Sequence, residues 1–282
     1  MKKLLPLLFA AILMLAGCSD NPFRKEISLT ASKPVNISVP ADLNPNGYAE
    51  LPNVQYGWGM KKNVNAPPDI PDTTKKIMEK YGAYYIDTIP RSLYLTFDEG
   101  YENGYTAQIL DVLKANDVKA AFFITGPYLE KETELVKRMV DEGHIVGNHT
   151  VHHPSMPQVK DAGELAKELT DLNDSFKQKF GQDMKYVRPP KGEYSERTLA
   201  ISNDLGYKSV FWSFAYMDWD PNKQKGEENA YNEIKKGVHD GCVLLLHAVS
   251  KDNANVLDRV IKDLKSEGYQ FKSLDEFGQA LN

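Results

Sequence analysis

Acidic, basic and imidazole side chains recur directly after short apolar stretches of this sequence. Such groups are costly beside a buried core unless they have partners or a function. Carboxylates and imidazoles brought together can transfer protons in catalysis or bind a metal ion, although loops are also polar simply because water surrounds them. The residues concerned are Asp98, Glu99, His149, His153, Arg188, Asp218 and His247.

The histidines are concentrated in one short stretch. Four of the six lie between positions 144 and 153, and His149 and His153 are four residues apart. In a helix, this spacing places two imidazoles on one face. Together with the carboxylate of Glu99 they could form a metal site with open positions for water and substrate. The same spacing also occurs among surface and capping histidines, so the residues alone leave both interpretations open.

The elements that would position these groups alternate along the chain. From Arg91 onward, short β-branched or aromatic runs are separated by helical patterns, such as the apolar steps of three and four between Leu165 and Phe180. This alternation predicts βα units, and about seven units favour an α/β barrel whose functional groups lie at the carboxyl ends of its strands. The predicted strands are 93–97, 120–125, 144–147, 186–187, 209–212, 243–246 and 269–271.

Composition excludes several classes of protein. The 282 residues are 41% hydrophobic and 26% charged, which is ordinary for a globular chain and excludes a disordered or collagen-like one. The net charge of -5 provides no excess of positive charge to hold a nucleic acid, so we expect no such partner. Two cysteines, Cys18 and Cys242, are too few for a disulfide scaffold or a zinc ribbon.

The N-terminus has the features of an export signal. Two lysines precede an uncharged apolar run over residues 4–17, which is too short for the ~30 Å hydrocarbon core of a membrane. Leu15-Ala16-Gly17-Cys18 resembles a bacterial lipobox, in which the cysteine is lipidated and becomes the mature N-terminus. We therefore expect a lipoprotein signal peptide over residues 1–17, lipidation of Cys18 and anchoring to the outer face of the cell membrane. An ordinary secretory signal is the alternative.

The next segment differs from the rest of the chain. Residues 18–54 are polar, contain several prolines and show no sustained periodicity, which predicts a tether. A strand-like run over residues 36–39 could still pair with another element. The catalytic domain is then expected to cover residues 55–282.

Four short motifs occur in a fixed order along this predicted domain. They are Thr96-Phe97-Asp98-Glu99-Gly100, Gly147-Asn148-His149-Thr150 with His153-Pro154, Arg188-Pro189-Pro190-Lys191-Gly192, and Leu245-Leu246-His247. This order resembles the NodB-like polysaccharide deacetylases, carbohydrate esterase family 4, which implies a distorted (β/α) barrel. Longer strings, such as Gly100-Tyr101-Glu102-Asn103-Gly104-Tyr105-Thr106, resemble the branch of delta-lactam-biosynthetic de-N-acetylases that act on muramic acid in spore-cortex peptidoglycan.

The resemblance implies a role for each polar residue. Asp98 would be the general base on the attacking water, His247 would protonate the leaving amine, and Arg188 would keep Asp98 ionised. Glu99, His149 and His153 would hold a divalent metal, most simply zinc, which polarises the acetamide carbonyl. The backbone N–H of Lys191 would stabilise the oxyanion. The residues expected to contact substrate are Lys191, Asp218, Trp219 and Leu245.

Two positions depart from the family pattern. Many members have a second Asp where this chain has Glu99, and the extra methylene moves the carboxylate by about 1.5 Å. Many also have an Asp that tunes the catalytic histidine, and alignment on Asp218-Trp219 places Ala215 at that position. Metal binding and the tuning of His247 are therefore open questions.

The branch resemblance implies an exported, lipid-anchored hydrolase that removes the N-acetyl group of muramic acid in peptidoglycan. The freed amine could then close a delta-lactam where an amidase has removed the stem peptide. The implied partners are glycan strands and a membrane, and a forespore location is compatible with this branch. An N-acetylglucosamine deacetylase acting on peptidoglycan or chitooligosaccharides is one alternative. A wall-binding lipoprotein on an inactive deacetylase scaffold is another.

Overall fold

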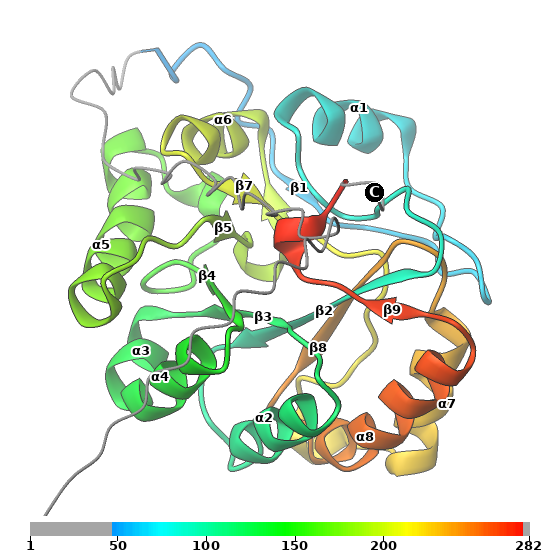
Figure 1. Ribbon diagram of the computed structural model, residues 1–282. Helices are drawn as coiled ribbons and strands as arrows, with labels where there is room; N and C mark the ends of the chain where they lie inside the picture. The colour runs from blue at the N-terminus through cyan, green and yellow to red at the C-terminus, as the bar shows by residue number, and fades with distance from the viewer. Residues whose placement is uncertain (1–46, 279–282) are drawn as a thin grey trace, which may run out of the picture. The chain divides into compact units, whose positions relative to one another are not determined.

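A computed structural model describes residues 47–278, in which parallel strands form one curled sheet with helices packed around it (Figure 1). The predicted signal peptide over residues 1–17, the lipidation site Cys18 and residues 19–46 of the predicted tether lie outside the described residues. Within the described part of the chain, no helix is both long and apolar enough to cross a membrane.

The main sheet has seven strands in the order β7, β5, β4, β3, β2 and β8, with β9 paired to the start of β2. Every pairing is parallel, so the carboxyl ends of the strands share one rim. The register places Asp98 opposite His247. The strands are β2 (Ser92–Glu99), β3 (Ala121–Ile124), β4 (Ile145–Asn148), β5 (Tyr186–Val187), β7 (Lys208–Ser209), β8 (Cys242–His247) and β9 (Gln270–Phe271).

The sheet closes through the segment that follows β7. Phe214 forms a parallel bridge with Leu244 of β8, and the backbone N–H of Leu245 donates to the Phe214 carbonyl at 2.9 Å. This contact joins the two edges of the curled sheet, which confirms the predicted distorted (β/α) barrel. Each predicted strand overlaps an observed one. The run predicted over 209–212 fits least well, because β7 covers only Lys208–Ser209.

Eight α-helices lie within the described residues, and their ends follow ordinary capping chemistry. In α5, the Asp161 carboxylate accepts a hydrogen bond from the Glu164 N–H at 2.9 Å, and Gly181 ends the helix in the left-handed region. This helix confirms the prediction from apolar spacing. The helices are α1 (Asp72–Tyr81), α2 (Thr106–Ala115), α3 (Gly126–Lys131), α4 (Thr133–Asp141), α5 (Ala162–Phe180), α6 (Glu196–Asp204), α7 (Glu227–Gly237) and α8 (Lys251–Ser266).

Side-chain alternation along β2 determines which residues reach the rim from inside the barrel. Tyr94 packs inside the barrel in a cluster with Phe123, whereas Phe97 packs in the layer between the sheet and the helices. Successive side chains of a strand point to opposite faces. Asp98 therefore points to the inside with Tyr94, and Glu99 points toward the helices with Phe97.

The segment before the barrel packs against α6. Tyr48 is buried, and its hydroxyl donates to the Asp204 carboxylate at 2.5 Å. The side chain of Asn53 accepts a hydrogen bond from the Ser195 hydroxyl at 2.7 Å. Residues 47–54, which we expected to belong to the tether, thus pack on the domain, and the domain reaches back at least to Tyr48.

A small antiparallel ladder lies outside the main sheet. It pairs β1 (Tyr56–Gly57) with β6 (Glu193–Tyr194), which directly follows the turn over residues 188–192 in the chain. The ladder brings Trp58 onto that turn. Short 3-10 helices complete the described elements, at Met156–Gln158, Pro190–Gly192, Pro221–Lys223 and Leu274–Glu276.

Candidate active site

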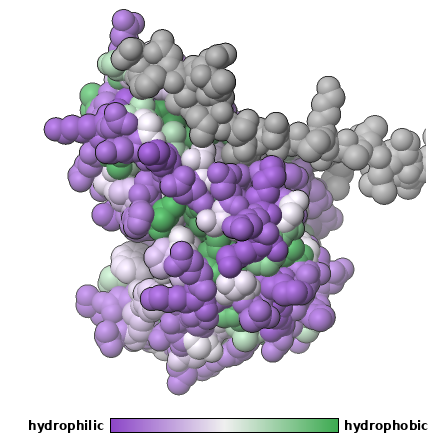
Figure 2. All heavy atoms as spheres, turned by 90° about the vertical axis from the view of Figure 1, so that its left-hand side faces the viewer, coloured by the Kyte–Doolittle hydropathy of each residue, from purple (hydrophilic) through white to green (hydrophobic). Residues whose placement is uncertain are grey.

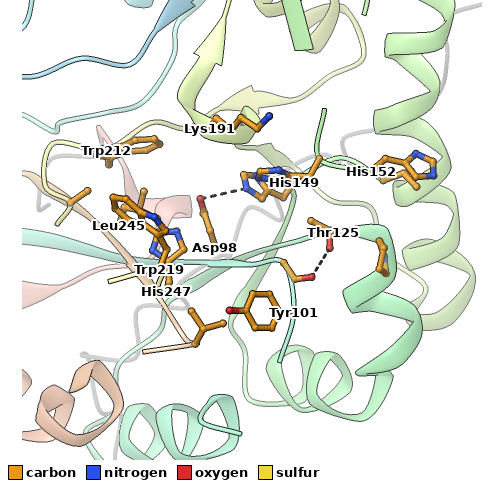
Figure 3. A pocket seen from close by; sticks show the side chains of 16 residues that line it. Asp98, Tyr101, Thr125, His149, His152, Lys191, Trp212, Trp219, Leu245 and His247 are labelled. Carbon is orange, nitrogen blue, oxygen red and sulfur yellow. Dashed lines mark hydrogen bonds and ion pairs between the residues drawn. The ribbon is translucent and has the colours of Figure 1, made fainter. Parts of the chain in front are cut away.

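A cavity of about 780 Å³ opens where the carboxyl ends of the strands meet (Figure 3). On the face drawn in Figure 2, apolar side chains lie in a hollow that hydrophilic side chains surround. Glu99, Arg188 and Asp218 do not line the cavity, although all three were expected in the site. The predicted site residues that do line it are Asp98, His149, His153, Lys191, Trp219, Leu245 and His247.

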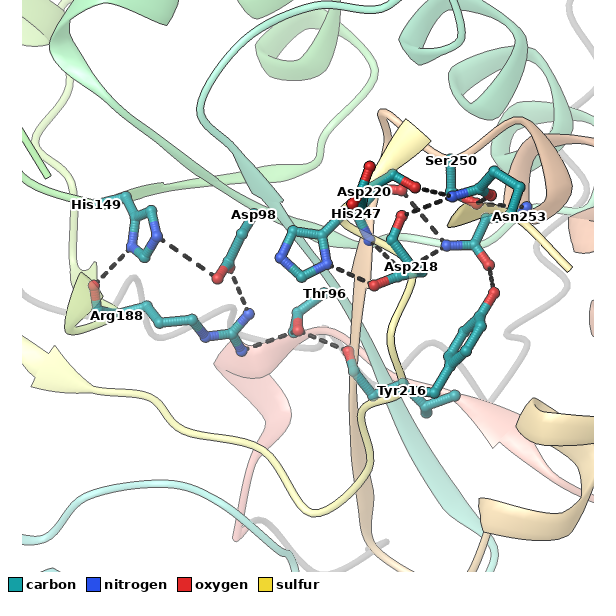
Figure 4. Close-up of polar contacts among 12 residues, drawn as sticks. Thr96, Asp98, His149, Arg188, Tyr216, Asp218, Asp220, His247, Ser250 and Asn253 are labelled. Carbon is teal, nitrogen blue, oxygen red and sulfur yellow. Dashed lines mark hydrogen bonds and ion pairs between the residues drawn. The ribbon is translucent and has the colours of Figure 1, made fainter. Parts of the chain in front are cut away.

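Asp98 is held by a buried guanidinium. The Nη1 atom of Arg188 donates to Asp98 Oδ1 at 2.8 Å, and Arg188 has no exposed surface (Figure 4). Burial raises the pKa of the Asp98 carboxyl, but the Arg188 guanidinium beside it more than offsets this and holds the pKa below its ordinary value. Asp98 is therefore ionised at neutral pH and can accept a proton.

The Arg188 side chain has little freedom to move. Its Nη2 donates to the Thr96 hydroxyl at 2.8 Å, and its Nε donates to the Val210 carbonyl at 3.2 Å. The guanidinium also stacks over the Phe123 ring at 4.2 Å from the centroid. Arg188 thus acts through Asp98 and does not face the cavity, which makes it a positioning residue.

His247 stands on the other side of Asp98 and is paired with a second carboxylate. Its Nδ1–H donates to Asp218 Oδ1 at 2.8 Å, and its other ring nitrogen points toward Asp98 (Figure 4). Burial lowers the pKa of His247, but the Asp218 carboxylate, helped by that of Asp98, outweighs burial and raises the pKa above its ordinary value. His247 can therefore carry a proton at neutral pH while Asp98 is ionised.

Asp218 has a different position from the one expected. It is buried, and its Oδ2 accepts hydrogen bonds from the His247 backbone N–H at 2.8 Å and from Asn253 Nδ2 at 2.6 Å. Its carboxylate is therefore occupied by protein groups, and Asp218 does not line the cavity. Ala215, at the position where many family members have the tuning Asp, lines the cavity and has no carboxylate. Asp218 supplies the carboxylate that tunes His247 instead. The sequence did not indicate that the Asp218 side chain is buried behind His247.

His149 and His153 lie together, but not on a helix. The loop that carries them places Thr150 and His153 in the left-handed region, with φ of 67° and 56°. The ring centroids of the two histidines are 4.8 Å apart. His149 Nδ1–H donates to the Arg188 carbonyl at 2.7 Å, which leaves Nε2 with a free lone pair 3.5 Å from Asp98 Oδ2. Burial lowers the pKa of His149 to about 4, so its ring is neutral.

Glu99 does not join the two histidines. Its side chain is fully buried, and neither carboxylate oxygen has a hydrogen-bond partner within the described residues. Burial raises the pKa of Glu99 well above its ordinary value, and the nearby carboxylates of Glu102 and Asp98 add to the shift. The expectation of a ligand at this position failed because β2 alternation sends Glu99 toward the helices.

The turn that carries Lys191 is held by two tryptophans. Lys191 and Gly192 both have positive φ, 58° and 65°, and a Cβ on Gly192 would lie 2.8 Å from both Trp58 and Trp212. The backbone N–H of Trp58 donates to the Gly192 carbonyl at 2.8 Å, and Trp58 Nε1 donates to the Trp212 carbonyl at 2.9 Å. Trp58 was not among the predicted site residues, yet it fixes the turn at the cavity.

An apolar wall lies beside His247. Trp219 and Leu245 line the cavity there together with Ala215. The Trp219 ring meets the His247 ring edge-on, with centroids 6.0 Å apart. This wall can hold a small apolar group such as a methyl next to the proton donor, as expected for the acetyl group.

Comparison with known proteins identifies the family. The polysaccharide deacetylase family model matches residues 85–210. The peptidoglycan-N-acetylmuramic acid deacetylase PdaA of Bacillus subtilis is 47% identical over 229 residues, which cover 80% of this chain and 87% of that protein. The chain belongs to the polysaccharide deacetylase family. It is therefore a hydrolase.

Solved structures of polysaccharide deacetylases have the same fold. Bacillus subtilis PdaA, a family 4 carbohydrate esterase, superposes with a TM-score of 0.78 at 46% identity, covering 80% of this chain and 98% of that one. A family 4 carbohydrate esterase from Bacillus anthracis gives a TM-score of 0.69 at 42% identity, covering 80% of this chain and 97% of that one. A peptidoglycan-N-acetylglucosamine deacetylase of Bacillus cereus is 33% identical over 189 residues, 66% of this chain and 67% of that protein.

Polysaccharide deacetylases generally depend on a metal ion. In this chain His149 and His153 could supply two imidazole ligands at the cavity. Within residues 47–278, however, no three carboxylate, imidazole or thiol groups lie close enough together to hold an ion. Glu99 does not complete the expected set of metal ligands with His149 and His153, and we assign no catalytic step to a metal.

The position of Glu99 leads to a prediction for stability. Replacing Glu99 by Met removes an unpartnered buried carboxyl, so the free energy of unfolding should rise by about 1–3 kcal/mol at pH 8. The pKa of Glu99 is higher in the folded state than in the unfolded state. The wild-type carboxyl therefore costs least stability below its unfolded-state pKa, and it costs more as the pH rises above that pKa. The gain should therefore be smaller at pH 4.5 than at pH 8, as measured by urea unfolding.

The isosteric Glu99→Gln variant is the control for this prediction, because it removes the charge but keeps a polar group. Its stability should vary less than that of the wild type between the two pH values. Loss of stability in Glu99→Met at both pH values, together with weaker zinc binding by calorimetry, would show instead that Glu99 is a metal ligand.

Proposed function

We propose that the chain is an exported hydrolase that removes the N-acetyl group from N-acetylmuramic acid in peptidoglycan. The observation that carries this proposal is the 47% identity to PdaA over most of both chains, together with the assembled Asp98, Arg188 and His247. A binding protein has no need for an ionised carboxylate and a protonated imidazole facing one cavity. The proposal therefore favours catalysis over binding on an inactive scaffold.

The geometry supports hydrolysis by one base and one acid. Asp98 takes a proton from water as its oxygen attacks the acetamide carbonyl carbon, which forms a tetrahedral intermediate. His247 then gives its proton to the amide nitrogen, the C–N bond breaks, and acetate and the free amine leave. The backbone N–H of Lys191, held by the turn that Trp58 supports, is the proposed donor to the oxyanion.

The further steps of the proposal follow from the substrate. A muramic acid amine lies near the lactyl carboxyl of the same sugar, and its attack on that carbonyl with loss of water closes a six-membered delta-lactam. The carboxyl must be free, so an amidase that removes the stem peptide has to act first. Lipidation of Cys18 would anchor the enzyme at the outer face of the cell membrane, where its glycan substrate lies.

The proposal is tested by mass spectrometry of amidase-treated glycan strands incubated with the full chain. We expect muramic acid to lose an acetyl group and then water. Loss of acetyl from glucosamine alone would replace this substrate with the one named for the Bacillus cereus relative. No change in either sugar, with or without added zinc, would contradict both activities and favour the binding protein.

A further inference from the structure

The cavity has a second wall whose residues take no part in the proposed reaction. Gly100 and Thr125 are in contact here, since the Thr125 hydroxyl donates to the Gly100 carbonyl at 3.4 Å. Val151 is brought beside them by the hydrogen bond from Gly126 N–H to its carbonyl at 3.1 Å. The cavity lining on this side comprises Gly100, Tyr101, Thr125, Pro127 and Val151.

Tyr101 is the exposed aromatic residue of this second wall. Within residues 47–278 only two aromatic side chains are exposed, Tyr101 and Trp219, each at 52%, and both line this one cavity. The Tyr101 hydroxyl has no hydrogen-bond partner within the described residues. Large exposed aromatic groups gathered at one cavity are typical of a binding site rather than of ordinary surface.

The two exposed rings lie on different sides of the reacting groups. Trp219 lies beside His247. In the view of Figure 3, Tyr101 lies on the side of Asp98 away from Lys191 and Trp212. A cavity of about 780 Å³ falls within the range that holds whole ligands and is far larger than an acetyl group requires. Space is therefore left for more of the substrate than the group that reacts.

We infer that Tyr101 and the second wall bind a sugar of the glycan strand adjacent to the sugar that is deacetylated. Sugar rings have apolar C–H faces that pack on aromatic rings and hydroxyl groups that remain hydrated at an open cavity. This wall offers an aromatic ring and apolar side chains with no charged group among them, which suits a neutral sugar. The inference rests on the proposed action on glycan and assigns Tyr101 to strand recognition.

The inference predicts a dependence on substrate length. Tyr101→Ala should lower kcat/KM on glycan fragments of three or more disaccharides by about tenfold, mainly through KM. On a single N-acetylated sugar, which has no adjacent sugar to place against the second wall, kcat/KM should change less than about twofold. Tyr101→Phe keeps the ring and should resemble the wild type on both substrates.

The measurement is the acetate that the full chain releases from each substrate, whether the acetyl group comes from muramic acid or from glucosamine. A failure of the muramic acid proposal would change which sugar is deacetylated and leave this length dependence intact. Val64→Ala is the control, because Val64 is exposed at 70% but does not line this cavity. Equal losses on the single sugar and on long fragments in Tyr101→Ala, or no loss on either, would overturn the inference.

Discussion

Replacing Asp98 by Asn should lower kcat by at least about 10³-fold, because an amide cannot take the proton of the attacking water. The change is nearly isosteric, so KM should vary much less than kcat. The variant also leaves Arg188 buried without its carboxylate partner, which should lower the free energy of unfolding by about 3 kcal/mol. Acetate release and thermal unfolding on the same preparation separate the two effects.

The matched control for Asp98 is an exposed carboxylate. Asp111 pairs with Arg138 at the surface, and Asp111→Asn should leave kcat and the free energy of unfolding nearly unchanged, because exposed ion pairs contribute little. If Asp98→Asn is folded at the assay temperature and retains more than about a tenth of the wild-type kcat, the base lies elsewhere.

The central strands were predictable because each contains a buried, mostly apolar run between polar segments. Leu93–Phe97 and Val243–Leu246 are examples, and both fall inside the observed strands β2 and β8. Parallel pairing then brings the groups that follow the strands to one rim, which is why Asp98, His149 and His247 could be expected to meet. Strand order and the closure at Phe214 depend on contacts distant in sequence and could not be deduced.

The two residues placed wrongly in the site share a cause. Glu99 was expected to join His149 and His153 as a metal ligand, yet it follows Asp98 by one residue in the strand and so points to the opposite side of the sheet. Asp218 was expected to face substrate with Trp219, yet it points back to Asn253 and the His247 ring. Residue type and order identified the chemistry, whereas the direction of each side chain depended on the backbone.

The charges of the site form a consistent set. Arg188 holds the pKa of Asp98 below its ordinary value, and Asp218 holds the pKa of His247 above its ordinary value. Between these two pKa values the base is ionised and the acid is protonated, which is the state the reaction needs. Burial lowers the pKa of His149 to about 4, so in this same range its ring remains neutral and adds no charge to the pair.

The pH dependence of Asp218→Asn tests this arrangement most directly. Activity needs protonated His247, so kcat/KM falls as pH rises through the pKa of that ring. Without the Asp218 carboxylate, the largest contribution that raises this pKa is lost, so the pKa falls and the alkaline limb should move to lower pH. At pH 8 the variant should lose about 10²-fold or more in kcat/KM, because Asn can also donate to Nδ1 and favour the wrong tautomer.

The acidic limb of that profile serves as an internal control. The acidic limb reports the pKa of Asp98, whose carboxyl is held by Arg188 and has no contact with Asp218. The acidic limb should therefore lie at the same pH in the variant as in the wild type. Asn253→Ala removes one hydrogen bond to Asp218 but keeps its charge, and should shift the alkaline limb much less. An alkaline limb that does not move in Asp218→Asn would mean that His247 is not the proton donor, because no other described carboxylate hydrogen-bonds to its ring.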